Sequence, residues 1–178
     1  MRIIGGSHKG RRFDVPRSFN SRPTTDMARE SLFNVLHNRY EFSSVNVIDL
    51  FAGTGAVSYE FASRGTEKIT TVDNNYKLTG FLKQQSKAFS FDHINVIRRD
   101  VFQYLKGNVR MADIIFADPP FDLKNIETIP NLIFDNNWLN EKGCLILEHS
   151  KEFNFEKHPN YSFNKRYGAV NFSFFFEG

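Results

Sequence analysis

Cysteine is nearly absent from this chain of 178 residues, which contains Cys144 alone. A single cysteine forms neither an intramolecular disulfide nor a cysteine zinc cluster, so the sequence favours a reducing compartment and predicts a cytoplasmic protein. No apolar run approaches the ~20 residues that a membrane span needs, and the N-terminus lacks the apolar core of a secretion signal. We therefore expect neither membrane insertion nor secretion.

Internal repeats and low-complexity linkers are also missing, and the composition, 40% hydrophobic and 24% charged, is typical of a globular protein. We expect a single domain over residues 1–178, long enough to bury roughly 70% of the surface of its unfolded chain. The net charge of +3 is unevenly distributed, because residues 1–40 carry +5 and the remainder carries −2. This basic segment fits either a polyanionic partner at one end of the molecule or an ordinary solvated surface.

The stretch Val45–Gly55 combines an apolar run with a glycine turn. The run predicts a strand buried on both faces, and Gly53-Thr54-Gly55 leads into a helical pattern from Ala56. This order opens a doubly wound α/β unit, whose ligand lies beyond the carboxyl end of the strand. Asp73 ends the next predicted strand, where a carboxylate can accept hydrogen bonds from two ribose hydroxyls. Because Ser58 stands where the dinucleotide fingerprint has its third glycine, a plain strand-to-helix turn remains an alternative.

Strands and helices alternate through the rest of the chain, which predicts a parallel sheet with helices on both faces. The expected strands are 45–50, 68–73, 94–98, 112–117 and 143–148, and the expected helices are 56–64, 75–89, 101–106 and 126–136. A small glycine-rich hairpin over 2–15 and a helix from Thr24 to Asn38, capped by Thr25 or Asp26, precede them. An antiparallel hairpin of 161–167 and 170–176 follows them.

The most informative motif is Asp118-Pro119-Pro120-Phe121, which follows the strand predicted at 112–117. The two prolines remove two backbone donors and stiffen the chain where α/β sheets bind ligands. An ionised Asp118 and the carbonyl of Pro119 only accept hydrogen bonds, so together they suit an –NH₂ group. Holding both N–H bonds of a nucleobase amine would aim the nitrogen lone pair at an electrophile, and Phe121 offers a face for an unstacked base. A structural Pro-Pro turn is the competing interpretation.

These motifs resemble a known family. Asp118–Phe121 matches the (Asp/Asn)-Pro-Pro-(Tyr/Phe) signature of amino-group methyltransferases that use S-adenosylmethionine, and Asp49–Gly55 is similar to their cofactor loop. The narrower resemblance is to the RsmD family, which methylates N2 of a guanine in 16S ribosomal RNA. It is carried by Met1–Gly6, Gly10–Arg12, Arg22–Asp26, Arg29–Asn34 and Glu148–Ser150. The chain departs from the pattern at Met27, where many members have a basic residue, and this departure concerns an RNA contact rather than the chemistry.

The resemblance implies a Rossmann-like class I methyltransferase fold, a mostly parallel seven-stranded sheet with an antiparallel C-terminal strand. Residues 1–22 would form a basic hairpin arm, and 23–40 would contain the leading helix. The enzyme would act as a monomer, without a metal, on 16S ribosomal RNA or the small ribosomal subunit. The implied catalytic residues are Asp118, Pro119, Pro120 and Phe121. The implied cofactor residues are Asp49, Phe51, Gly53, Gly55, Asp73, Asn74, Asp100, Val101 and Thr25. The implied RNA contacts are Arg2, Lys9, Arg11, Arg12 and Arg22.

Three other functions remain open. A nicotinamide-dependent oxidoreductase would explain Gly53, Gly55 and Asp73 but not the Asp-Pro-Pro-Phe motif or the basic arm. An amino-methyltransferase that acts on adenine N6 or on a protein glutamine would share the same motif. A non-catalytic RNA-binding module would not need it. The five histidines have no metal-ligand spacing, and we expect them at the surface or against RNA.

Overall fold

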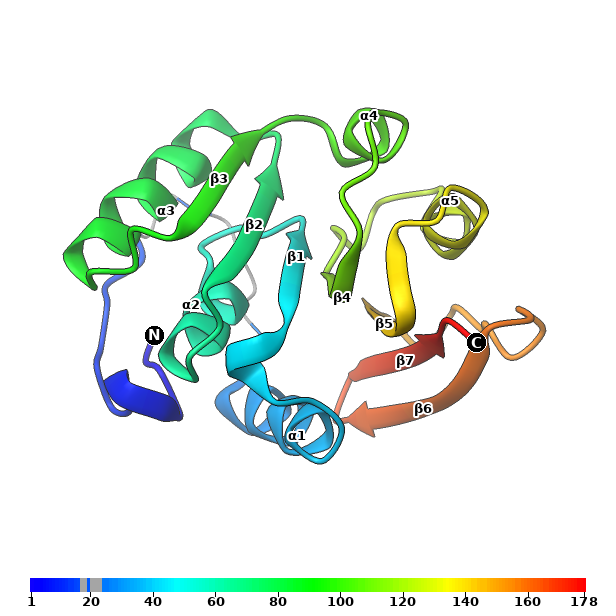
Figure 1. Cartoon of the computed structure of the whole chain (residues 1–178), viewed down its shortest axis with the longest axis horizontal. Coiled ribbons are helices and arrows are strands. Elements are labelled where there is room, and N and C mark those ends of the chain that lie inside the picture. The colour runs from blue at the N-terminus through cyan, green and yellow to red at the C-terminus, as the bar shows by residue number, and fades with distance from the viewer. Residues whose placement is uncertain (17–18, 20–23) are drawn as a thin grey trace.

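The protein is built around one seven-stranded sheet with the order β3-β2-β1-β4-β5-β7-β6 (Figure 1). The computed structural model describes residues 1–16, 19 and 24–178. The strands are β1 Asn46–Leu50, β2 Lys68–Asp73, β3 Ile94–Arg98, β4 Ala112–Ala117, β5 Leu139–His149, β6 Tyr161–Tyr167 and β7 Val170–Phe176. The helices are α1 Asp26–His37, α2 Ala56–Ser63, α3 Tyr76–Ala88, α4 Val101–Leu105 and α5 Thr128–Asp135, with short 3₁₀ turns at Gly6–His8 and Phe42–Ser44.

Strands β1 to β5 are parallel to one another, and β7 lies antiparallel between β5 and β6. This arrangement confirms the predicted fold and the predicted terminal hairpin. The boundaries agree within about two residues except in β5, which begins at Leu139 rather than at 143. The additional residues pair Leu139 with Ala112, and the register then shifts before Ile114 pairs with Cys144. The hydrophobic pattern does not predict this bulge or the early start of β5, because the charged residues Glu141 and Lys142 interrupt the apolar run.

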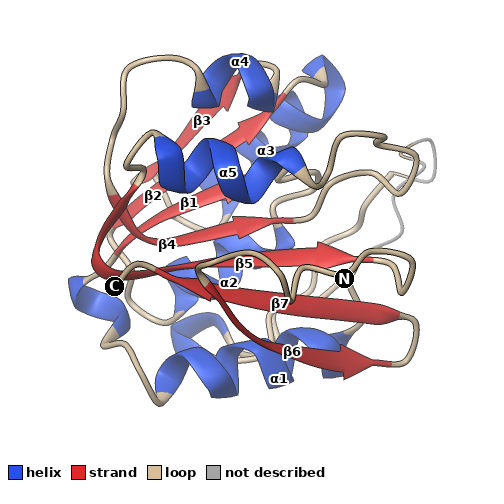
Figure 2. Cartoon of the chain, turned by 90° about the vertical axis from the view of Figure 1, so that its right-hand side faces the viewer, coloured by secondary structure: helices blue, strands red, loops and turns tan. Residues whose placement is uncertain are grey.

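Two apolar layers cover the two faces of the sheet. Helices α1, α2 and α3 pack on one face, and α4 and α5 pack on the other (Figures 1 and 2). Neighbouring residues of a strand alternate between the layers, as Phe116 and Ile146 face the first and Ala117 and Leu147 face the second. This alternation determines which side chains project over each face where the strands end.

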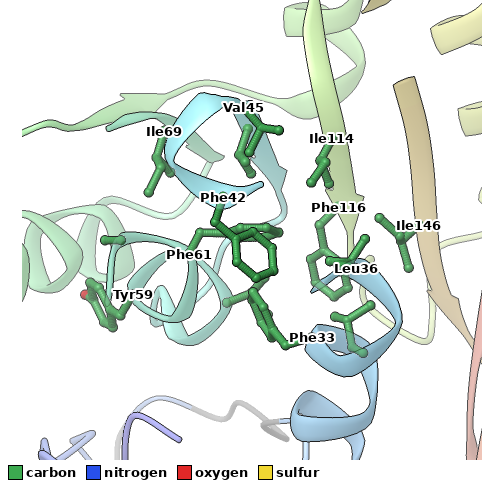
Figure 3. Packing of buried hydrophobic residues seen from close by; sticks show 14 of the residues in the cluster. Phe33, Leu36, Phe42, Val45, Tyr59, Phe61, Ile69, Ile114, Phe116 and Ile146 are labelled. Atoms are coloured by element: carbon green, nitrogen blue, oxygen red, sulfur yellow. The ribbon is translucent and has the colours of Figure 1, made fainter. Parts of the chain in front are cut away.

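The first layer is rich in aromatic rings (Figure 3). Phe33 of α1 lies 4.7 Å from Phe61 of α2 between ring centroids, and Phe42 lies 5.8 Å from Phe33. Leu32 and Leu36 of α1 are buried in the same layer. Because burying a large apolar side chain contributes about 1.5–3 kcal/mol, this contact fixes α1 firmly beside the sheet.

The N-terminal segment pairs with itself but forms no regular strands within residues 1–16. Its antiparallel pairing is a single bridge between Arg2 and Arg12, and Ile3 donates a backbone hydrogen bond to the Arg11 carbonyl at 2.9 Å. The predicted hairpin is therefore shorter than expected, because a 3₁₀ turn occupies the middle of the segment. Ile3 and Phe13 enter the first apolar layer, so the segment leans on the domain.

The segment is held against α2 mainly through its own backbone. The buried carboxylate of Glu60 accepts from the N–H groups of Ile4 at 2.5 Å and of Gly5 at 3.4 Å. Ser63 accepts from the His8 N–H at 2.9 Å and donates to the Gly5 carbonyl at 2.6 Å. Gly6 has φ of +75°, and a Cβ there would lie 1.9 Å from the Ser63 carbonyl oxygen. Glycine is therefore required at this position.

One histidine contradicts the sequence-based expectation. His149 ends β5 and is buried, whereas we expected every histidine at the surface or against RNA. Its Nδ1 lies 2.8 Å from the Ser150 carbonyl, which only accepts, so Nδ1 carries the proton and Nε2 accepts from Ser173 Oγ at 2.8 Å. Burial lowers the pKa of His149, and the neutral ring serves the packing of β5 against β7.

Among the described residues no helix is long and apolar enough to cross a membrane. The same part of the chain contains no group of three or more His, Cys, Asp or Glu side chains arranged to hold a metal ion.

Candidate active site

A cleft of about 580 Å³ opens beyond the carboxyl ends of the parallel strands. It lies where the strand order reverses, since β1 is flanked by β2 on one side and β4 on the other. The residues that line it are Phe51, Gly53, Asp73, Asn74, Asn75, Leu78, Asp100, Val101, Phe102, Asp118, Pro119, Pro120, Phe121, Asp122 and Leu123. Two motifs that are 67 residues apart along the chain, at Asp118 and Phe51, thus meet in one hollow.

Asp73 anchors the loop that follows β1. One carboxylate oxygen of Asp73 accepts from the Gly53 N–H at 2.9 Å, and the other accepts from the Asn75 N–H at 2.8 Å. Phe51 adopts φ of +58°, an unusual conformation for a bulky residue. Such strain is common at functional sites, and sequence reasoning had no signal for it.

Gly55 supports the loop from behind rather than lining the cleft. Its φ is +83°, and a Cβ would lie 2.8 Å from the ring of Tyr59 and 2.9 Å from Leu82. The glycine is therefore needed for close packing between the start of α2 and helix α3. This role differs from the close approach to a ligand that the sequence suggested.

Asp100 and Val101 form the far wall of the cleft. Asp100 is the N-cap of α4, and its side chain accepts from the Gln103 N–H at 3.0 Å. One carboxylate oxygen makes this bond, so the other retains its acceptor capacity, and Asp100 lines the cleft.

The Asp118–Phe121 motif forms the wall opposite Asp100. Asp118 continues β4, and its N–H donates to the Leu50 carbonyl at 3.3 Å, which holds the motif beside the end of β1. Pro119 is buried, while Phe121 is 53% exposed, and both residues line the cleft. The arrangement places a hydrogen-bond acceptor and an aromatic side chain along the same cleft.

A second hollow of about 70 Å³ adjoins the cleft and shares Phe51, Gly53 and Asp118 with it. Asp49 lines this hollow and accepts from Ser58 Oγ at 2.5 Å. Thr24 also lines it and donates to the carboxylate of Glu148 at 2.8 Å. Glu148, which was noted in the sequence only as part of the family resemblance, thus belongs to the surroundings of the site.

The carboxyl groups around the second hollow have raised pKa values. Burial raises the pKa of Asp49 to about 7, and the Ser58 hydrogen bond opposes this rise. Burial also raises the pKa of Glu148 to about 7, opposed by the bond from Thr24. For Asp118 burial is the main cause of a strongly raised pKa, and the charges of Glu148 and Asp49 add to it. Such perturbed groups are concentrated at functional sites.

Thr25 lies outside both hollows. It is the N-cap of α1 and accepts from the Ala28 N–H at 3.2 Å, as one of the two capping alternatives predicted. Its neighbour Thr24 lines the second hollow instead. Of these two threonines, Thr24 is therefore the one placed to contact a ligand.

The basic residues of the N-terminal segment have different environments. Lys9, Arg11 and Arg12 are exposed, and the Arg11 guanidinium lies 5.0 Å from the centroid of the Phe89 ring. Arg2 forms an ion pair with Asp26 at 2.6 Å. Arg22 lies outside the described residues.

Not all of the positive charge counted in residues 1–40 is available to a partner. Arg29 is 1% exposed and pairs with Asp26 at 2.7 Å, inside the contact between α1 and the N-terminal segment. The counted charge therefore overstates the charge that this part of the surface presents.

The strand order and the cleft define the methyltransferase fold. The solved structure of an RNA methyltransferase from Salinibacter ruber, in complex with S-adenosyl-L-homocysteine, superposes with a TM-score of 0.69 at 10% identity, covering 86% of this chain and 92% of that one. The solved structure of the Escherichia coli protein yhhF superposes with a TM-score of 0.87 at 30% identity, covering 99% of this chain and 97% of that one.

The sequence model of the family described as Conserved hypothetical protein 95 matches residues 1–176, and the chain belongs to this family. It is 32% identical over 152 residues to the ribosomal RNA small subunit methyltransferase D of Escherichia coli strain K12, covering 85% of this chain and 76% of that protein. The predicted membership of the RsmD family is confirmed.

Proposed function

We propose that this chain transfers a methyl group from S-adenosylmethionine to the exocyclic N2 amine of a guanine in 16S ribosomal RNA. The observation that carries the proposal is the meeting of Asp73, Asp100 and the Asp118–Phe121 motif in one cleft. Membership of the RsmD family supports the substrate, since its Escherichia coli relative is named for the ribosomal RNA of the small subunit.

The cleft residues fit the cofactor. Each oxygen of Asp73 accepts one backbone N–H, and since a carboxylate has about four acceptor positions, two remain for ribose hydroxyls. Asp100 would accept from the adenine amine, with Val101 beside the ring, and Asn74 would border the ribose. Phe51, Gly53 and Asp49 would surround the methionine part, and Gly55 would support their loop from behind.

The cofactor supplies an electrophilic methyl group on a sulfonium sulfur. Asp118 and the Pro119 carbonyl would hold the two N–H bonds of the amine, so that the nitrogen lone pair points toward that methyl group. Pro120 keeps this loop rigid, and Phe121 would stack on the unpaired base. The chain therefore contributes mainly by positioning the two reactants.

The RNA would lie against the N-terminal segment. Lys9, Arg11 and Arg12 present positive charge that suits phosphates, while Arg2 is engaged with Asp26 and would act mainly by fixing the segment on α1. We assign Arg22 to the same contact on the resemblance alone. We propose that the enzyme acts as a monomer, and we place it in the cytoplasm with its substrate.

One experiment tests the function. The protein is incubated with S-adenosylmethionine labelled in the methyl group and, separately, with small-subunit RNA, with small ribosomal subunits and with DNA. The products are then digested to nucleosides. We expect label in N2-methylguanosine from one of the first two substrates and none with the Asp118→Ala variant. Label in N6-methyladenosine or in protein would contradict the proposed substrate, and no transfer to any substrate would contradict the proposed reaction.

A further inference from the structure

We propose that Glu148 is a positioning residue for the methyl transfer: it forms with Asp118 a carboxyl pair that takes up the proton released by the amine. The inference rests on the proposed function. It begins with the register of β4 and β5, in which Ala117 pairs with Leu147. Asp118 and Glu148 are the next residues of these two strands, so they are neighbours at the carboxyl edge of the sheet.

The two side chains project to the same face. Ala117 and Leu147 face the layer of α4 and α5, so the residues that follow them face α1 and α2. Asp49 of β1 projects to this face as well, because its side chain bonds to Ser58 on α2. Thr24 reaches the Glu148 carboxylate from the start of α1 and fixes its position.

The charged groups that act on Asp118 are both acidic, Glu148 of β5 and Asp49 of β1. Thr24 and the partner of Glu148 on β7, Phe172, carry no charge. The ammonium of Met1, a residue that also lines the second hollow, donates to the Phe13 carbonyl at 2.9 Å. Two neighbouring carboxylates in a buried site cannot both ionise easily, so they share a proton over part of the pH range. The raised pKa values of both groups agree with this sharing.

The reaction needs such a proton acceptor. When the amine nitrogen bonds to the methyl carbon, the C–S electron pair returns to sulfur, which becomes a neutral thioether, and the nitrogen becomes cationic. The N–H electron pair then stays on nitrogen while the proton moves to the Asp118 carboxylate. Glu148 makes Asp118 a stronger base for this step, because the negative charge of one carboxylate favours protonation of the other.

The test is the pH dependence of kcat for Glu148→Gln at saturating cofactor and RNA. Glutamine still accepts from Thr24 but carries no charge, so the pKa of Asp118 should fall. The acid limb, where the rate declines because Asp118 becomes protonated, should move to lower pH by at least half a unit. At high pH kcat should decrease several-fold because Asp118 is then a weaker base. Glu141→Gln, an exposed change at the other end of β5, is the matched control and should leave the profile unchanged.

An unshifted acid limb in folded Glu148→Gln would overturn the proposal and leave Glu148 as a structural anchor for Thr24. Folding of the variant is checked by its melting temperature. If it does not fold, carbon-13 NMR of labelled glutamate in Asp118→Asn replaces the rate measurement. The Glu148 carboxyl signal should then titrate at lower pH than in the wild type, and an unchanged titration would contradict the pair. Absence of methyl transfer by the wild type at every pH would instead refute the proposed function.

Discussion

The replacement Asp73→Ala tests the proposed cofactor site most directly. The Asp73 carboxylate organises the loop through Gly53 and Asn75 and leaves two acceptor positions for the ribose. Hydrogen bonds to a charged group contribute about 1.5–3 kcal/mol, so losing this acceptor should weaken S-adenosylmethionine binding roughly 10- to 150-fold. Asp73→Asn keeps one acceptor oxygen, and we expect it to lose less affinity.

Isothermal titration calorimetry at pH 7.5 measures these affinities. Asp92→Ala is the matched control, because Asp92 is exposed and lies outside the cleft, so its affinity should equal that of the wild type. The melting temperature of Asp73→Ala without ligand separates lost binding from lost folding. An affinity of Asp73→Ala within twofold of the wild type would remove Asp73 from the cofactor site and refute this part of the reasoning.

Three further predictions follow from the geometry. Asp118→Ala should abolish methyl transfer and leave cofactor affinity within a few fold, and wild-type turnover would rule out the orienting role. Replacing both Arg11 and Arg12 by Ala should reduce the salt dependence of RNA binding. The slope of the logarithm of the association constant against the logarithm of the salt concentration should become shallower by up to ~1.4, because each phosphate contact on a single strand contributes about 0.7. The melting temperature should fall only slightly, through the Arg11 contact with Phe89, and an unchanged slope would leave the segment as a solvated surface. Asp49 has a folded pKa of about 7 against an ordinary 3.8, so stability declines as pH rises between these values. Asp49→Asn should therefore raise the melting temperature more at pH 8 than at pH 5, and equal shifts would contradict the raised pKa.

Most of the sheet and of the cleft could be predicted from the sequence, because the patterns that indicate them lie within short stretches of the chain. Buried parallel strands are continuous apolar runs, and the turns after 50 and 117 carry glycine or proline. Since the carboxyl ends of parallel strands share one edge, Asp73 and Asp118 could be assigned to one site before their contacts were known.

The features that the sequence could not predict depend on contacts between distant segments. The bond from Thr24 to Glu148 joins residues 124 apart, and only the register of β4 and β5 reveals Glu148 beside Asp118. His149 follows one position later and was expected at the surface or against RNA, yet it is buried against Ser173 of β7 and the ring of Phe155. The shorter N-terminal hairpin has a similar origin, because its packing on α2 rather than its own ladder stabilises it.

The way in which the N-terminal segment is attached has a consequence for evolution. Glu60 and Ser63 hold the segment through N–H and carbonyl groups, which every residue other than proline provides. The attachment thus constrains the backbone, and Gly6 in particular, but not the identity of the exposed side chains. Basic residues such as Lys9 and Arg12 can be exchanged one at a time while the segment stays in place. Selection could therefore retune the contact with a partner without rebuilding the fold.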